Sequence, residues 1–281
     1  NGLFDEITGG AEYYWFLSDL VKNFDENAES IIQNFEKAAS LIFSQENLIV
    51  AVTCDDTDMP TFSKGVSSFI ASLPNQQATY KKWNLKQEKK NEGLLTASKV
   101  QYVLQGWDFK QLGYKWDGSM RVLNQVLSRD YLQNTIRVLG GAYGGFSSFS
   151  PSGRAYFASY RDPNLKETLD NYAATPEWLH EFEADETEMT RLIIGAIAQM
   201  DKPLTPSEKG SIAFRRYFQK TTGEMAQNDR DAVINTTPEE IRSMEKMISD
   251  ILGQKAWCVY GNEDKIESEK TLFNNVIELM R

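Results

Sequence analysis

Residues 137–145 read RVLGGAYGG and place a guanidinium, a phenol and four glycines within nine positions. We expect a helix to end near Leu139 and the glycine pair that follows to turn the chain into a strand, because glycine adopts positive φ freely. Arg137 and Tyr143 would then flank a turn without side chains, where their donors suit a peptide carbonyl or a developing oxyanion. A tight helix-to-strand corner packed against a neighbouring strand explains the same glycines without a ligand. The residues alone leave both interpretations open.

Metal chemistry has little support in the sequence. Zinc sites take three or four Cys, His or carboxylate ligands, and the chain has one histidine, His180. We interpret His180 as a polar residue near a helix end. An acidic run follows it and is interpreted as solvated surface and the first turn of a helix, in preference to a paired-carboxylate site. This run consists of Glu181, Glu183, Asp185, Glu186 and Glu188. We therefore predict that no residue of this chain binds a metal ion.

Nucleophilic and phosphate chemistry are also disfavoured. No Gly-x-Ser-x-Gly motif occurs, and Cys54 and Cys258 lie in apolar runs that predict buried free thiols in a reducing compartment. The glycines of residues 140–145 follow a helix and enter a strand, which is the reverse of a phosphate-binding loop, and no lysine follows them. We therefore reject a phosphate site.

Composition narrows the remaining choices. The 281 residues are 41% hydrophobic and carry a net charge of −10, which disfavours nucleic-acid binding and would attract cationic peptides. No apolar run reaches the roughly 18–20 residues of a membrane span, and no signal peptide opens the sequence. We expect a cytoplasmic or organellar-matrix protein with no membrane partner.

Hydrophobic periodicity predicts the elements of the first third of the chain. Apolar residues at i, i+3 and i+4 predict helices over 11–24 and 27–43, with another within 58–73. A short apolar strand is expected at 47–54. The polar, lysine-bearing stretch 76–92 reads as a linker.

The rest of the chain begins with strand-like sequence at 94–107 and an amphipathic helix at 119–136, followed by the glycine-rich hairpin. Three helix starts are marked by capping residues: Asp162-Pro163, Thr205 with Glu208, and Thr237 with Glu240. A strand at 255–261 and a helix at 264–280 complete the pattern.

The two ends of the chain share an order of elements. Residues 35–73 and 238–280 both read as helix, apolar strand, acidic turn and helix, and aligning Val52 with Val259 offsets the copies by 207 residues. If both ends belong to copies of one repeated domain, residues 76–281 would form a complete copy and residues 1–75 the last third of a preceding copy. A coincidence of common elements is the alternative.

Two motifs resemble a known family. R-x-x-G-G-A-Y-G (Arg137–Gly144) followed by S-Y-R-D-P (Ser159–Pro163) is similar to the C-terminal half of the insulinase (pitrilysin) family of zinc metallopeptidases, and most similar to its presequence-protease subfamily. The segments KKNEGLL (89–95), ASKVQYV (97–103) and DKPLTPSEKG (201–210) extend the likeness over essentially the whole chain.

This resemblance implies an α+β fold in which repeated domains carry a mixed or antiparallel sheet flanked by helices. Residues 1–75 would be the end of a third domain, 76–92 a linker and 93–281 a complete fourth domain. The family's zinc motif, H-x-x-E-H, is absent from this sequence. The resemblance therefore implies that the N-terminal half of the same polypeptide holds the zinc and that this chain alone is inactive.

The resemblance also implies roles for the corner. Arg137 and Tyr143 would bind the peptide substrate and stabilise the tetrahedral intermediate across a closed chamber. The small residues would clear space for the substrate strand; they are Gly140, Gly141, Ala142 and Gly144. The alternative is a non-catalytic structural or chaperone-like homologue of the same fold.

Overall fold

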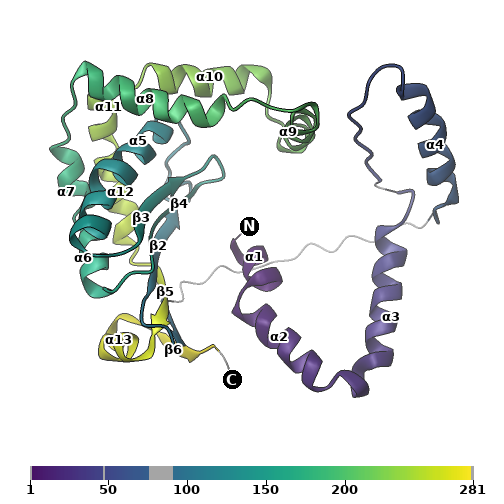
Figure 1. The fold of residues 1–281 in the computed structure, drawn as a ribbon, viewed down its shortest axis with the longest axis horizontal. Helices are drawn as coiled ribbons and strands as arrows, with labels where there is room; N and C mark the ends of the chain where they lie inside the picture. Colours follow the sequence, from purple (N-terminus) through teal and green to yellow (C-terminus); the bar gives the residue numbers. More distant parts are fainter. Residues whose placement is uncertain (1, 47, 76–90, 280–281) are drawn as a thin grey trace. The chain divides into compact units, whose positions relative to one another are not determined.

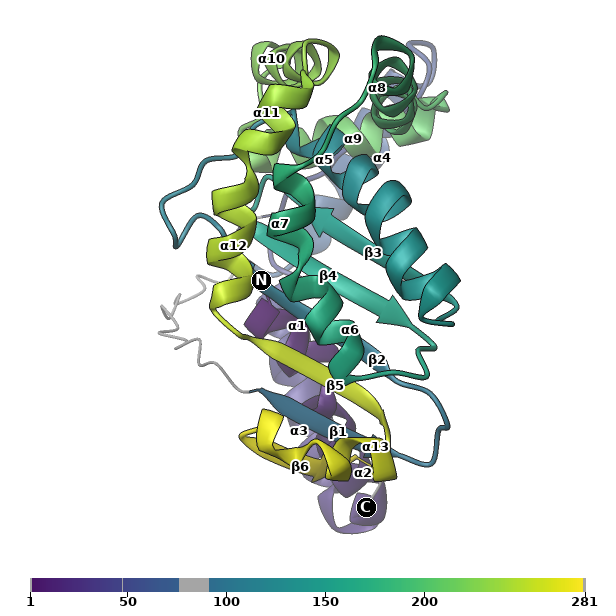
Figure 2. The ribbon, with the colours of Figure 1, turned by 90° about the vertical axis from the view of Figure 1, so that its left-hand side faces the viewer.

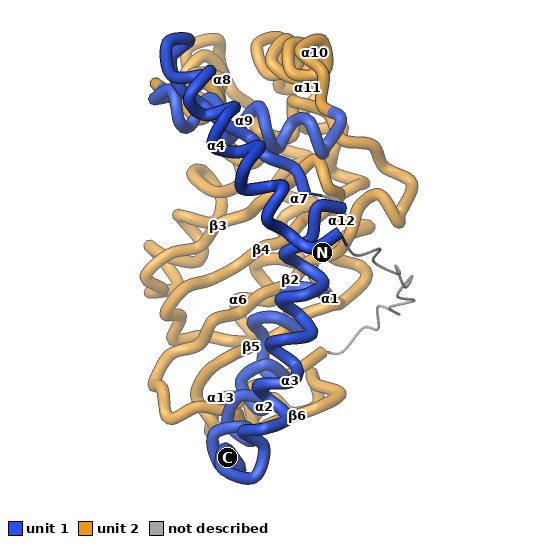
Figure 3. Tube along the Cα trace, turned by 90° about the vertical axis from the view of Figure 1, so that its right-hand side faces the viewer, with its two compact units in different colours: residues 1–87, 204–220 blue, residues 88–203, 221–281 orange. Residues whose placement is uncertain are grey.

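The computed structural model describes residues 2–46, 48–75 and 91–279. The chain divides into two compact units, drawn in different colours in Figure 3. Unit 1 comprises residues 1–87 and 204–220, and unit 2 comprises residues 88–203 and 221–281. The predicted linker lies outside the described residues, apart from Asn91 and Glu92.

Unit 1 is helical in its described part. Its helices are α1 (Gly2–Gly9), α2 (Ala11–Lys22), α3 (Phe24–Ile42), α4 (Met59–Ser72) and α9 (Pro206–Gln219). Helices α2, α3, α4 and α9 contain no buried residue. Val21 is 73% exposed and Phe35 72%. The predicted helices of the first third are thus confirmed, but within the described part of unit 1 their apolar faces enclose no core.

The strand predicted at 47–54 is wrong over its described part. Residues 48–55 form neither helix nor strand, and Asn47 lies outside the described residues. A strand needs a neighbour for its backbone hydrogen bonds, and the described part of unit 1 contains no other strand. Cys54 is accordingly exposed, which contradicts its predicted burial, and Cys258 in unit 2 is half-buried.

Unit 2 is built on a six-stranded mixed sheet. Its strands are β1 (Glu92–Thr96), β2 (Tyr102–Asp108), β3 (Gly144–Phe149), β4 (Arg154–Tyr160), β5 (Trp257–Asn262) and β6 (Asn275–Glu278). They lie in the order β3-β4-β2-β5-β1-β6, which Figure 2 shows from the helical side. Strand β1 pairs in parallel with β5 and β6, and the other pairs are antiparallel. The predicted α+β fold with a mixed sheet is confirmed.

Helices of unit 2 cover one face of this sheet or pack against the helices that do. They are α5 (Met120–Val126), a π-helix (Leu127–Leu139), α6 (Lys166–Ala173), α7 (Thr175–His180), α8 (Glu186–Met200), α10 (Gly223–Ile234), α11 (Pro238–Ser243), α12 (Glu245–Gly253), α13 (Glu263–Ser268) and a 3₁₀ turn (Lys270–Leu272). Helices α5, α6, α7 and α12 lie on the same side of the strands (Figure 1). Beneath them, Val103, Phe157 and Val259 are fully buried. The core of unit 2 therefore lies between the helices and this face.

The end of the chain departs from its prediction. Only Glu263–Ser268 is α-helical within the predicted helix 264–280, and Asn275–Glu278 is strand β6. Strand β6 pairs with β1, and the Asn274 N–H donates to the Asn91 carbonyl at 2.9 Å. The backbone groups at the open edge of β1 thus pair with residues 275–278 despite their helical pattern. Periodicity did not predict this, because it reflects only residues close together in the chain.

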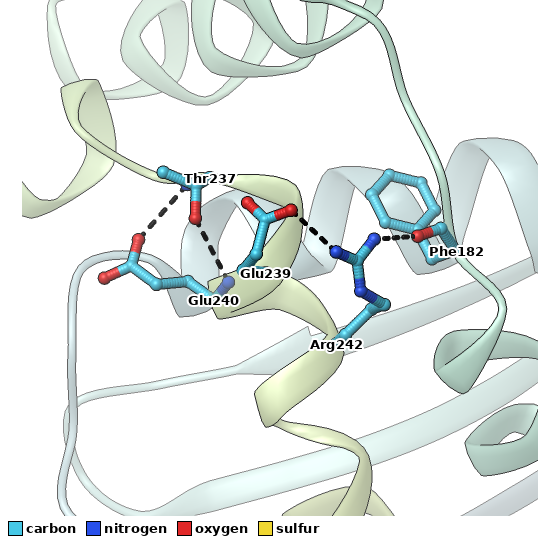
Figure 4. Close-up of polar contacts among 5 residues, drawn as sticks. All are labelled: Phe182, Thr237, Glu239, Glu240 and Arg242. Carbon is cyan, nitrogen blue, oxygen red and sulfur yellow. Dashed lines mark hydrogen bonds and ion pairs between the residues drawn. The ribbon is translucent and has the colours of Figure 1, made fainter.

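Capping confirms two of the three predicted helix starts. Thr205 and Glu208 form a capping box at α9, and Thr237 and Glu240 form one at α11. Figure 4 shows the second box with the Arg242 guanidinium beside it, which donates to the Phe182 carbonyl at 2.7 Å. The third start is wrong, because α6 begins at Lys166 rather than directly after Asp162.

Candidate functional site

The glycine corner joins the π-helix to strand β3 within unit 2. In the π-helix the buried residues Leu127, Tyr131, Leu132 and Ile136 recur at intervals of four and five positions, which places them on one face. The helix ends at Leu139, as predicted. The Ala142 N–H then donates to the Ile136 carbonyl at 3.1 Å, which closes the turn.

Arg137 and Tyr143 meet across this turn. The Arg137 guanidinium lies over the Tyr143 ring, 5.7 Å from the ring centroid, at cation–π distance. Tyr143 is 65% exposed, and Arg137 is exposed as well. Among the described residues, no carboxylate lies within ion-pair distance of Arg137. The structure therefore brings the two predicted residues together and leaves both accessible.

The four glycines of the corner occupy positions with different local environments. A Cβ at Gly140 would lie 2.6 Å from the Ile136 carbonyl oxygen, and a Cβ at Gly145 would lie 2.7 Å from the Ile136 Cβ. Gly141 has φ +79°, which favours glycine. Only at Gly144 among these four would an added Cβ meet no heavy atom within 4 Å. Close internal contacts therefore account for glycine at positions 140 and 145, whereas Gly144 is open on the side where a Cβ would point.

The second motif, residues 159–163, and the residue after it contact the corner through hydrogen bonds and an aromatic ring. The Tyr143 N–H donates to the Tyr160 carbonyl at 3.1 Å, and the Asn164 side-chain amide donates to the Gly140 carbonyl at 2.6 Å. The Tyr160 ring also contacts the Tyr143 ring edge-on at 5.7 Å. Sequence reasoning identified Tyr160 only as part of a motif and missed Asn164, although both follow the corner closely in the chain.

Asp162 anchors this segment. Its side chain is fully buried, and its carboxylate accepts from the Asn164 backbone N–H at 2.9 Å and from the Thr168 hydroxyl at 2.7 Å. Burial raises the pKa of Asp162 above its ordinary value, and the hydrogen bonds from Thr168 and Asn164 oppose that rise. The predicted N-cap residue thus orders the loop before α6.

Removing this carboxylate should destabilise the chain. We expect Asp162→Ala to lower the free energy of unfolding by about 1–3 kcal/mol, because the donors of Asn164 and Thr168 lose a buried acceptor. Asp162→Asn retains an acceptor and removes the buried charge, so it should cost less. Urea unfolding of the two variants and the wild type measures the difference.

The raised pKa of Asp162 also predicts the sign of a pH effect. Ionisation is less favourable in the folded chain than in the unfolded one. The wild type should therefore lose stability relative to Asp162→Asn as the pH rises from about 4, the ordinary aspartate pKa, through the raised value. If the difference in unfolding free energy between the wild type and Asp162→Asn is the same at acidic and neutral pH, burial of the Asp162 carboxylate has no such cost.

His180 and the acidic run lie elsewhere in unit 2. His180 is the last residue of α7, is exposed, and its Nδ1 lies 2.8 Å from the Glu245 carboxylate. Asp185 caps α8, and Glu186 and Glu188 occupy its first turn. The predicted position of His180 near a helix end and the predicted helix start within the acidic run are confirmed. Within the ranges that the structure describes, no group of three or more His, Cys, Asp or Glu side chains lies close enough to hold a metal ion.

A pocket of about 370 Å³ opens beside α7 and α8, away from the corner residues. Its lining includes four carboxylates and two aromatic rings: Asp130, Glu181, Glu183, Glu188, Trp178 and Phe182. Burial raises the pKa of Asp130, while Arg191 at 3.7 Å lowers it. Part of the net negative charge thus gathers on the helical side of unit 2.

The corner and its sheet match a known class of protein domain. Residues 91–259, well over half of the chain, match the family described as the PreP C-terminal domain. The chain belongs to this family, so its likeness to the presequence-protease branch of the insulinase-type peptidases is confirmed.

Two relatives are similar along the whole chain. Protein HypA of Clostridium perfringens is 40% identical over 280 residues, which are 100% of this chain and 29% of the relative. Presequence protease 1, chloroplastic/mitochondrial, of Arabidopsis thaliana is 30% identical over 282 residues, which are 100% of this chain and 26% of that protein. The chain therefore spans less than a third of either relative.

A solved structure shares the fold. The crystal structure of pitrilysin aligns with a TM-score of 0.52 at 12% identity, over 73% of this chain and 23% of pitrilysin. At this identity the likeness shows the fold alone.

None of the helices that the structure describes combines the length and apolar character needed to cross a membrane.

Proposed function

We propose that this chain is the substrate-binding part of a longer zinc-dependent endopeptidase that degrades unstructured peptides in a closed chamber. The observation that supports this most is the exposed Arg137–Tyr143 pair on an open corner, in a member of the PreP C-terminal domain family. Guanidinium and phenol groups are enriched where proteins bind other chains.

In this proposal the two side chains act on the scissile region of the peptide. Arg137 donates to a peptide carbonyl with its forked N–H groups, and Tyr143 adds its hydroxyl. Both donors stabilise negative charge as it develops on the carbonyl oxygen, which is the usual action of an oxyanion site. Gly141 and Gly144 let the peptide backbone approach, while Gly140 and Ala142 set the shape of the turn.

The side chains of this chain do not fit a catalytic zinc ion. Its sequence has one histidine, and no ligand cluster occurs in its described part. We therefore derive no step through the metal from these residues. The proposal assigns zinc to the N-terminal half of the same polypeptide, with residues 1–75 ending a third domain and 93–281 forming a fourth.

A location follows from the same proposal. Two relatives are named as chloroplastic/mitochondrial and mitochondrial proteases. Together with the two free cysteines, these names support a cytoplasmic or organellar-matrix enzyme.

Separated parts of the polypeptide test the proposal. This chain alone should neither cleave a fluorogenic unstructured peptide nor retain stoichiometric zinc. The longer polypeptide should do both, and adding this chain to the isolated preceding part should restore cleavage. Cleavage by the chain alone would contradict the proposal. A longer polypeptide without H-x-x-E-H and without activity would favour the structural or chaperone-like alternative.

A further inference from the structure

Four tyrosines form a continuous row on the face of the sheet opposite the core helices. The tyrosine row comprises Tyr143 before β3, Tyr160 on β4, Tyr102 on β2 and Tyr260 on β5, and these strands are neighbours (Figure 2). Successive ring centroids are 5.7, 5.2 and 5.6 Å apart. The row therefore begins at the Arg137–Tyr143 corner and reaches β5, the fourth of the six strands in the sheet order.

The direction of these side chains follows from strand alternation. Val103 and Val259 are fully buried under the helices, so their neighbours Tyr102 and Tyr260 project from the opposite face. Tyr160 remains 43% exposed. Among the described residues, no hydrogen-bond partner is found for the hydroxyl groups of the row. The row thus offers ring surface together with free hydroxyl groups.

A second row of apolar residues lies beside the first. In register, Phe146 faces Ala158, Ala158 faces Leu104 and Leu104 faces Cys258. Phe146 is 41% exposed and Leu104 43%. These two rows contain no charged side chain, and the corner itself carries the cation of Arg137, with Arg161 next to Tyr160 in the chain. The surface is therefore apolar and ends in positive charge.

We propose that the tyrosine row is a side-chain subsite that selects peptides with aromatic or large aliphatic residues next to the bond held at Arg137 and Tyr143. The inference rests on the proposed function. Tyrosines bind extended peptides well, because the ring gives contact area at low entropic cost and the hydroxyl pairs with backbone groups. The absence of carboxylates from both rows removes any attraction for cationic side chains here, although the chain as a whole is acidic.

A peptide series in the longer polypeptide tests the subsite. Each unstructured peptide carries Phe, Leu, Ala, Lys or Asp at one position, moved stepwise across both sides of the cleaved bond. For the wild type, kcat/KM should be about tenfold higher for Phe than for Ala at one or two positions. The variant Tyr102→Ala/Tyr160→Ala should lose most of this ratio, and Tyr160→Phe should keep it. The matched control is Tyr217→Ala, an exposed tyrosine of α9, which should not change the ratio.

The outcomes separate the two proposals. Wild-type cleavage without side-chain preference, or an equal loss on all peptides in the double variant, would overturn the subsite and leave the proposed function standing. No cleavage by the wild type would overturn the proposed function. If the tyrosine variants lower the melting temperature and leave selectivity intact, another part of the polypeptide covers the row, and the subsite is wrong. Should the double variant fail to fold, Leu104→Gln on the same exposed surface carries the same test.

Discussion

Replacing Arg137 with alanine in the longer polypeptide is expected to lower kcat/KM for peptide cleavage by about 10²–10³-fold, the usual effect of losing one oxyanion donor. Tyr143→Phe should have an effect of the same order, because it removes the hydroxyl and keeps the ring over which the guanidinium lies. Arg137→Lys retains the charge without the planar fork and should recover only part of the rate. Zinc content should be unchanged in all three variants.

Arg154 supplies the matched control for Arg137. Its guanidinium also lies over a tyrosine ring, 5.9 Å from the Tyr156 centroid, on the same sheet and away from the corner. Arg154→Ala should therefore leave cleavage close to wild type. Wild-type turnover in both Arg137→Ala and Tyr143→Phe would refute the assignment of the corner.

The second large effect concerns stability. Gly145→Val should lower the free energy of unfolding by about 3 kcal/mol, because overpacking of a close contact forces the backbone or the Ile136 side chain to shift. Even a Cβ at this position would lie 2.7 Å from the Ile136 Cβ. Chemical denaturation of purified protein measures the loss.

The adjacent glycine is the control. A Cβ at Gly144 meets no heavy atom within 4 Å, so Gly144→Val should change stability by less than about 1 kcal/mol. Equal destabilisation at both positions would mean that general strand effects, rather than the contact with Ile136, govern the requirement for glycine.

Local sequence signals predicted the elements that carry the corner. The helix end at Leu139, the glycine turn and the hairpin follow from residue types that act within a few positions of each other. The capping boxes at Thr205 and Thr237 were equally readable, since each satisfies its own backbone donors. A third box, Asp185 with Glu188, was present in the sequence and was missed.

Features that depend on distant pairing were not predictable in this way. Strand β6 forms because the edge of β1 is available to it, and the apolar stretch after α3 stays outside any strand in the described part of unit 1. The tyrosine row also depends on pairing between strands that are distant in the chain. Tyr102, Tyr160 and Tyr260 are far apart in the chain, and only the register of β2, β4 and β5 aligns their rings.

The position of a bound peptide tests the central claim most directly. A structure of the longer polypeptide, with its metal half disabled and an uncleaved unstructured peptide bound, should show a peptide carbonyl within hydrogen-bond distance of the Arg137 guanidinium and the Tyr143 hydroxyl. A peptide bound elsewhere, with Arg137 and Tyr143 left to solvent, would contradict the account.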